Sequence, residues 1–275
     1  MQFYQNVLAI NPTAAQACTG IGYIYAQKGL FYEAENKFKE AIKWQKTGVF
    51  VEEAYFYLIK LYKDKGEYDN AIKTMEELIS SGYGEKSRNY ILLGDIYKEK
   101  HLPNKAFYYY KHAVSLEPQN ANGYFILGNK YRDAELYDQA IIEYNKAIEI
   151  NPYHIDARNN KGITYFDKGQ FDQAIEEYEQ LIQIKPDFVK TYYNLGTLYL
   201  IKKLYHKAVD ILEQAIKLEP GNIKAYINLG DAYFAIGNYQ RAKESYGFVL
   251  NIDPDNVIIR NKYNESAVSI NNGKK

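Results

Sequence analysis

The sequence predicts an all-α solenoid, built as a stack of helix-turn-helix repeats rather than around one central core. Three observations predict this class. Apolar residues recur with the i, i+3, i+4, i+7 spacing that marks one face of a helix. A tyrosine and an alanine return at fixed places in each period. Prolines fall 34 residues apart, a period typical of helical repeat arrays, at Pro118, Pro152, Pro186, Pro220 and Pro254.

Seven complete repeats result when the recurrent proline is numbered position 32. These predicted repeats run from residue 15 to residue 256 and begin at Ala15, Glu52, Ser87, Ala121, Ile155, Val189 and Ile223. Residues 1–14 are predicted to be a partial repeat, a lone second helix that closes at Pro12. Residues 257–275 are predicted to form a C-terminal capping helix and tail, because a repeat array needs a polar terminal face.

The first and second helices of each repeat are predicted from separate apolar stripes. Positions 4, 7, 8 and 11 share one face of the first helix, and positions 20, 24 and 27 share one face of the second. Position 11 is always Tyr, position 20 is always Ala, and position 8 is Gly except at Ile59. The small residues let the two helices approach closely, and a larger side chain there would overpack by about 1–3 kcal/mol. Most of the 30 tyrosines fall in four columns and are expected to fill the remaining grooves.

Turn signals agree with this period. Gly169 and Gly237 lie between the two helices of a repeat, where glycine can adopt the positive φ that ends a helix. Asn120, Asn222 and Asn256 stand where a first helix begins, and Asn is a favoured N-cap residue. The first two repeats are less regular, so residues 46–49 and 80–84 are predicted to be flexible joints.

The repeat pattern resembles the tetratricopeptide repeat over nearly the whole chain, with an aromatic residue at position 4, Leu-Gly at 7 and 8, Tyr at 11, Ala at 20 and 27, and Pro at 32. The resemblance implies a right-handed superhelical solenoid. It also implies a protein–protein interaction scaffold that binds a peptide or helix of a partner protein on a concave face. In this family that face is lined by first-helix positions 2, 5, 6, 9, 12 and 13.

Composition favours a protein partner over other partners. Lys plus Arg and Asp plus Glu are 34 each, so no global field attracts nucleic acid or an anionic membrane. The groove positions mix Lys190 and Lys224 with Asp156, Asp167 and Asp231, which disfavours RNA. One cysteine, no signal peptide and no long apolar run predict a soluble, cytoplasmic protein. The oligomeric state is not predicted. The chain begins within a repeat, so we expect a segment of a longer array or an N-terminal edge that packs on another subunit.

No pattern of enzyme chemistry is present, and we expect no catalytic residue, cofactor or metal site. The phosphate-loop, dinucleotide, zinc-protease and serine-hydrolase motifs are missing. The four histidines are dispersed among repeats 3, 4 and 6. Cys18 at position 4 is expected to be buried and inert. Acidic residues of one second helix are expected to lie on its solvated face, namely Glu176, Glu177 and Glu179.

Candidate ligand-binding residues are found where polar side chains recur on first helices. Position 6 is Asn in the last three repeats, and an amide can donate and accept hydrogen bonds at once. Lysines at position 2 would complement an acidic residue. Arg158 and Lys161, at apolar positions, are expected to reach a ligand or to extend their charges to water. The predicted concave-face site comprises Asn129, Asn160, Lys190, Tyr193, Asn194, Lys224 and Asn228.

Three other interpretations stay open. Asparagines at these positions are common in the family and can serve solubility and local hydrogen bonding. The array would alternatively be the substrate-selecting arm of a larger enzyme, such as a protein O-linked glycosyltransferase, whose asparagine ladder it resembles. A chaperone-tail adaptor is the third. Asn129, Asn160 and Lys190 match three positions of that clamp, whereas Phe125 and Asn194 replace its two other cations.

Overall fold

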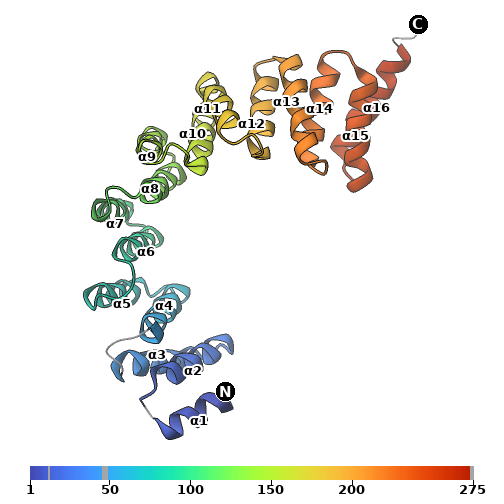
Figure 1. Ribbon diagram of the computed structural model, residues 1–275. Helices are drawn as coiled ribbons and strands as arrows, with labels where there is room; N and C mark the ends of the chain where they lie inside the picture. Colours follow the sequence, from blue (N-terminus) through green and yellow to red (C-terminus); the bar gives the residue numbers. More distant parts are fainter. Residues whose placement is uncertain (12, 45–48, 273–275) are drawn as a thin grey trace. The chain divides into compact units, whose positions relative to one another are not determined.

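The computed structural model describes residues 1–11, 13–44 and 49–272, which form sixteen helices without a strand (Figure 1). This confirms the predicted all-α solenoid of helical repeats. Pro12 lies outside the described residues, as do residues 45–48, which include all but the last residue of the predicted joint at 46–49. The chain divides into two compact bodies, an N-terminal body of Met1–Gly123 and a C-terminal body of Tyr124–Lys275.

Consecutive helices of the N-terminal body pack as hairpins, α2 on α3, α4 on α5 and α6 on α7. The helix α4 begins three residues before Glu52. The helices are α1 (Gln2–Ile10), α2 (Ala15–Gln27), α3 (Phe31–Trp44), α4 (Val49–Asp64), α5 (Tyr68–Ser80), α6 (Lys86–Glu99) and α7 (Pro103–Leu116).

The C-terminal body continues the same arrangement. Hairpins stack through α9 on α10, α11 on α12, α13 on α14 and α15 on α16, and α12 also contacts α14 directly. The first helices α12 and α14 of two successive repeats therefore lie side by side. The helices are α8 (Ala121–Asp133), α9 (Tyr137–Ile150), α10 (Ile155–Asp167), α11 (Phe171–Ile184), α12 (Val189–Ile201), α13 (Tyr205–Leu218), α14 (Ile223–Ala235), α15 (Tyr239–Ile252) and α16 (Val257–Asn272).

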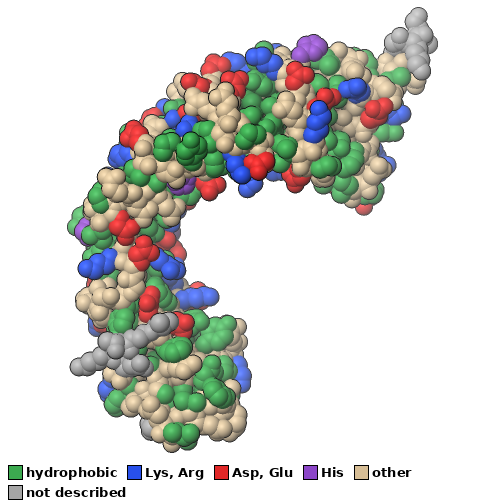
Figure 2. Space-filling view, viewed as in Figure 1, with side chains coloured by type: hydrophobic (Ala, Val, Ile, Leu, Met, Phe, Trp, Pro, Cys, Tyr) green, Lys and Arg blue, Asp and Glu red, His purple; other side chains and the backbone are tan. Residues whose placement is uncertain are grey.

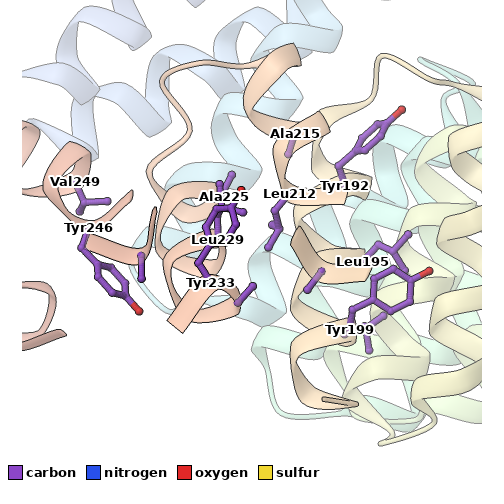
Figure 3. Close-up of a cluster of buried hydrophobic side chains, with 14 of the residues drawn as sticks. Tyr192, Leu195, Tyr199, Leu212, Ala215, Ala225, Leu229, Tyr233, Tyr246 and Val249 are labelled. Atoms are coloured by element: carbon purple, nitrogen blue, oxygen red, sulfur yellow. The ribbon is translucent and has the colours of Figure 1, made fainter. Parts of the chain in front are cut away.

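A bulky side chain, in most cases a Tyr ring, packs on a glycine in each regular hairpin of the C-terminal body. A methyl group added at Gly128 would lie 2.6 Å from Tyr144 Cε1, and one added at Gly162 would lie 2.7 Å from Tyr178 Cε1. In the hairpin of α12 and α13, the glycine is Gly196 and the side chain packed on it is a leucine instead of a ring. The buried cluster shown in Figure 3 continues this packing from repeat to repeat, through Tyr192, Leu195, Tyr199, Leu212, Ala215, Ala225, Leu229, Tyr233, Tyr246 and Val249.

Helix starts follow the predicted asparagine caps. The side-chain oxygen of Asn222 accepts from the backbone N–H of Ala225 at 3.0 Å, and that of Asn256 accepts from Ile259 at 3.1 Å. Asn120 accepts from Gly123 at 3.3 Å. These bonds satisfy donors that the first turn of a helix leaves free. His154 performs the same role for α10, with Nδ1 3.2 Å from the nitrogen of Ala157.

Helix ends follow the predicted positive-φ turns only in part. Gly169 and Gly237 have φ values of 76° and 79°, as predicted. In other repeats the same left-handed conformation is held by residues with a side chain, including Glu135 and Lys203, both at φ 59°. The left-handed region costs an L-residue about 1–2 kcal/mol. These turns therefore store a small amount of strain that glycine would relieve.

We predict that Gly128→Ala lowers the free energy of unfolding by about 1 kcal/mol or more. The overpacking cost of about 1–3 kcal/mol against Tyr144 exceeds the gain in helix propensity of about 1 kcal/mol. Gly123→Ala in the same helix is the control, because its new methyl would lie 3.8 Å from Val114 Cγ2. Denaturant unfolding measures both. Equal changes for the two variants would contradict the steric explanation.

We also predict that Glu135→Gly and Lys203→Gly each stabilise the protein by about 0.5–1 kcal/mol. The relieved left-handed strain exceeds the added backbone entropy of glycine in the unfolded chain. Lys202→Gly is the control, since Lys202 has φ −75° and gains nothing from glycine. Its loss includes that of the surface ion pair with Asp172, which is worth about 0–1 kcal/mol. Thermal and denaturant midpoints measure the effect. A loss of stability in all three variants would show that the turns are unstrained.

Candidate functional site

All seven predicted site residues lie on first helices of the C-terminal body. Asn129 is on α8 and Asn160 is on α10, whereas α12 carries Lys190, Tyr193 and Asn194, and α14 carries Lys224 and Asn228. Residues three and four apart share one side of a helix. We call the side formed by positions 2, 5, 6 and 9 of α8, α10, α12 and α14 the first-helix face.

Polar bonds between neighbouring first helices already use part of the asparagine ladder. Asn160 Nδ2 donates to Asn129 Oδ1 at 2.8 Å, and Asn228 Nδ2 donates to Thr197 Oγ1 at 2.7 Å. Each bond links position 6 of one repeat to position 9 of the repeat before it. Lys262 Nζ contacts Asp231 in the same register, at 2.6 Å. We call these contacts the rungs of the first-helix face. The asparagines therefore hold repeats together and retain only part of their hydrogen-bonding capacity.

In two of these rungs the position-9 acceptor also accepts a hydrogen bond from the Tyr at position 24 of the second helix. The Tyr144 hydroxyl donates to Asn129 Oδ1 at 2.8 Å, and the Tyr246 hydroxyl donates to Asp231 Oδ1 at 2.6 Å. Burial raises the pKa of Tyr144 to about 12. Both lone pairs of the Asn129 amide oxygen are consequently occupied within the protein. This oxygen is not available to a ligand.

The rung between α10 and α12 lacks a hydrogen bond between positions 9 and 6, and we call it the open rung. Position 9 of α10 is Ile163, which offers Asn194 no polar partner. Asn194 Nδ2 instead lies 3.4 Å from the Tyr178 hydroxyl, longer than a good hydrogen bond. Tyr178 is only 2% exposed. A pocket of about 250 Å³ opens here, lined by Ile163, Phe166, Asp167, Tyr178, Asn194 and Thr197.

Sequence reasoning identified Asn194 but missed the pocket beside it. A signal was present, because the other position-9 residues of α8 to α14 are polar, namely Asn129, Thr197 and Asp231. Ile163 is the exception in this column. The consequence of this exception depends on the contacts of position 9 with position 24 of its own repeat and position 6 of the next repeat. Only the packed structure shows these contacts.

The two position-2 lysines are exposed on the first-helix face. Lys224 Nζ lies 5.9 Å from the centre of the Tyr193 ring, within the range of a cation–π contact. In the part of the chain that the structure describes, no carboxylate forms an ion pair with Lys190 or Lys224. Acidic and basic side chains are otherwise intermixed along the described helices on the face seen in Figure 2. These two charges are therefore available to a partner.

Arg158 and Lys161 neither reach out to a ligand nor extend to water, so that expectation was wrong. Lys161 Nζ lies 2.6 Å from Glu177 Oε1, and Arg158 Nη1 lies 3.4 Å from Glu177 Oε2. The three side chains are only 12%, 13% and 9% exposed for Arg158, Lys161 and Glu177. The prediction that Glu177 lies on a solvated face was also wrong, whereas Glu176 and Glu179 are exposed. Glu177 is the counter-charge for two cations at apolar positions.

We predict that Glu177→Gln destabilises the C-terminal body by about 3 kcal/mol. Removing one member of a buried ion cluster leaves the others uncompensated, which typically costs about 3–5 kcal/mol. The neighbouring exposed residue supplies the control Glu176→Gln, expected to change stability by less than about 0.5 kcal/mol. Replacing Arg158, Lys161 and Glu177 together by Leu should restore most of the loss. Denaturant unfolding tests all three, and a silent Glu177→Gln would contradict the cluster.

Other chemical features add no second site. No three His, Cys, Asp or Glu side chains among the described residues are grouped so that they could hold a metal ion. Cys18 is buried, and burial together with nearby Glu40 raises the pKa of its thiol. The raised pKa reduces the thiolate fraction and with it the reactivity. None of the described helices combines the length and apolar character needed to cross a bilayer.

A stack of helical hairpins with one continuous first-helix face belongs to the class of protein-interaction scaffolds. Family models described as TPR repeat match residues 128–169 and 162–203. Models described as tetratricopeptide repeat match residues 199–261, residues 15–47 and 87–120, and residues 53–81. The chain belongs to the tetratricopeptide repeat family, as its residue pattern predicted.

Solved structures share this fold. A crystal structure of MamA protein is 27% identical, covers 62% of this chain and 92% of its own, and has a TM-score of 0.54. MamA from Desulfovibrio magneticus RS-1 is 21% identical, covering 63% and 98%, with a TM-score of 0.55. The C-terminal part of a TPR repeat-containing protein from Cytophaga hutchinsonii is 18% identical, covering 89% and 98%, with a TM-score of 0.65. The last two likenesses show the fold alone. No curated protein matches the chain.

Proposed function

We propose that this protein holds an extended segment of a partner protein against the first-helix face of its C-terminal body and performs no chemistry of its own. This face would be the concave face expected of the family. The observation that carries the proposal is the exposure of Lys190 and Lys224, two cations without an ion-pair partner among the described residues, on one stripe with Tyr193 and Asn194. An acidic residue of the partner segment would complement the lysines.

Other cations near this face are paired with carboxylates, in contrast to Lys190 and Lys224. Arg158 and Lys161 are neutralised by Glu177, and Lys262 is neutralised by Asp231. These cations therefore contribute little to attraction at long range. The two position-2 lysines lie one repeat apart on adjacent helices. A segment that runs across α12 and α14 would meet both.

The remaining capacity of the asparagines would add main-chain contacts. Asn228 uses Nδ2 on Thr197, and its Oδ1 makes no hydrogen bond with another described residue. Each hydrogen bond contributes only about 0.5–1.5 kcal/mol net, whereas micromolar binding requires about 8 kcal/mol. Polar contacts alone are insufficient. The Tyr193 ring and the pocket beside Asn194 supply the apolar contact that the proposal requires.

The test is capture of partner proteins from the source cell by the intact chain and by a Lys190→Glu, Lys224→Glu variant. We predict that partner affinity falls at least about tenfold, because two attractive charges become repulsive. Both side chains are exposed, so the fold should be unaffected. Substituting the asparagines would be a poorer test, since Asn160 and Asn228 also link repeats.

The control is Lys207→Glu, Lys217→Glu on the second helix α13, which changes the net charge equally. Its affinity should remain within about twofold of the original, because these lysines lie away from the first-helix face. Equal losses in the two variants would indicate a general charge effect. Full retention of every partner by the Lys190, Lys224 variant would overturn the proposed site.

A further inference from the structure

The buried hydroxyl at the open rung differs from its equivalents. Tyr110, Tyr144 and Tyr246 each donate to the position-9 residue of their own repeat, at 2.6, 2.8 and 2.6 Å. Tyr178 has the same place in its repeat, but Ile163 offers it no acceptor. Among the described residues, the Tyr178 hydroxyl makes only the 3.4 Å contact with Asn194 Nδ2. This distance is long whichever way the amide is turned.

This hydroxyl remains a donor under all ordinary conditions. Burial, and then the nearby Asp167 carboxylate, raise the pKa of Tyr178 well above its usual range. This donor lines the pocket and has no acceptor among the described residues. An oxygen atom of a ligand in the pocket would supply that acceptor. Asn194 Nδ2 lies beside the hydroxyl and would donate to the same oxygen.

The pocket walls limit what such a ligand would be. Ile163 and Phe166 form an apolar wall, next to the two polar donors. The exposed carboxylate of Asp167 lines the same pocket, so it would repel a second carboxylate and would accept from an N–H group. A volume of about 250 Å³ lies below the roughly 300–1,000 Å³ of small-molecule sites. The pocket therefore suits one residue of a chain.

We propose that the open-rung pocket anchors one apolar residue of an extended partner segment, whose neutral main-chain carbonyl oxygen accepts hydrogen bonds from Tyr178 and Asn194. The apolar side chain lies against Ile163 and Phe166, and the adjacent N–H group faces Asp167. This inference rests on the proposed function and names the chemistry of the partner at one position. Asn194 is four residues from Lys190 on α12, so the anchor and the lysine would contact the same segment.

The most informative variant supplies the missing acceptor of the open rung from the protein itself. Ile163→Asn supplies an amide oxygen where Asn129 supplies one two helices earlier, and that oxygen would accept from Tyr178 and Asn194. The variant would therefore satisfy the donors and block the pocket while the fold stays intact. Tyr178→Phe removes one donor and keeps the ring. Ile163→Val keeps the apolar wall and adds no acceptor, and it serves as the control.

The probe is N-acetyl-leucine N-methylamide, with N-acetyl-leucine as its charged counterpart, titrated into the intact chain. Nuclear magnetic resonance follows the Asn194 side-chain amide and the Thr197 methyl group. We expect saturable shifts with the neutral probe and at least about threefold weaker binding of the acid. Tyr178→Phe should weaken binding roughly three- to tenfold, the value of one hydrogen bond. Ile163→Asn should abolish the shifts without lowering the melting temperature, and Ile163→Val should bind within about twofold.

Three results would overturn the proposal: no saturable shift with the neutral probe, equal binding by Ile163→Asn, or tighter binding of the acid. A partner that depends on Lys190 and Lys224 but binds Ile163→Asn unchanged would overturn the anchor alone and leave the scaffold function standing. If the lysine reversal, Ile163→Asn and the probe are all without effect, both proposals fail.

Discussion

The structure depends on one steric relation, the packing of a bulky side chain, usually a Tyr ring, on a glycine within each regular hairpin of the C-terminal body. The Tyr144 ring lies where any side chain at Gly128 would stand, and Tyr178 is related to Gly162 in the same way. Close packing of this kind leaves no room for independent changes. The hairpin of α4 and α5 is consistent with this constraint, because Ile59 replaces the glycine and Met75 replaces the ring. The flexible thioether fills an irregular space more readily than a ring.

The same tyrosines connect the core to the surface. A ring at position 24 is buried against the first helix, and its hydroxyl emerges at position 9 of that helix. There it donates to Asn129 or Asp231, and the position-6 side chain of the next repeat donates to the same residue. The polar surface is thus supported directly by the core. A single aliphatic residue, Ile163, interrupts it beside a pocket where the Tyr178 hydroxyl has no acceptor among the described residues.

The ionic cluster on α10 and α11 illustrates how packing selects which charges a partner meets. Arg158 and Lys161 occupy positions that are apolar in other repeats, and Glu177 compensates them in a largely buried setting. Buried pairs of this kind contribute little net stability, because desolvation offsets much of the attraction. Their consequence is to remove two cations from the surface. Lys190 and Lys224 remain exposed.

The sequence by itself determined the helical repeat architecture, because the period, the Gly and Ala columns and the Asn caps are local or periodic features. Each of them acts within a few residues, so a linear pattern records them faithfully. The family followed from the same columns. The candidate lysines and asparagines were also placed on one set of helices by their spacing alone.

Tertiary structure decided what those side chains do. Asn160 and Asn129 are 31 residues apart, and Arg158 and Glu177 are 19 apart, so each pairing depends on how helices stack. A periodic pattern states that a side chain recurs and does not state which neighbour it meets. For the same physical reason the sequence showed Ile163 only as an exception in one column, whereas the pocket and the Tyr178 hydroxyl that lines it became visible only in the packed helices.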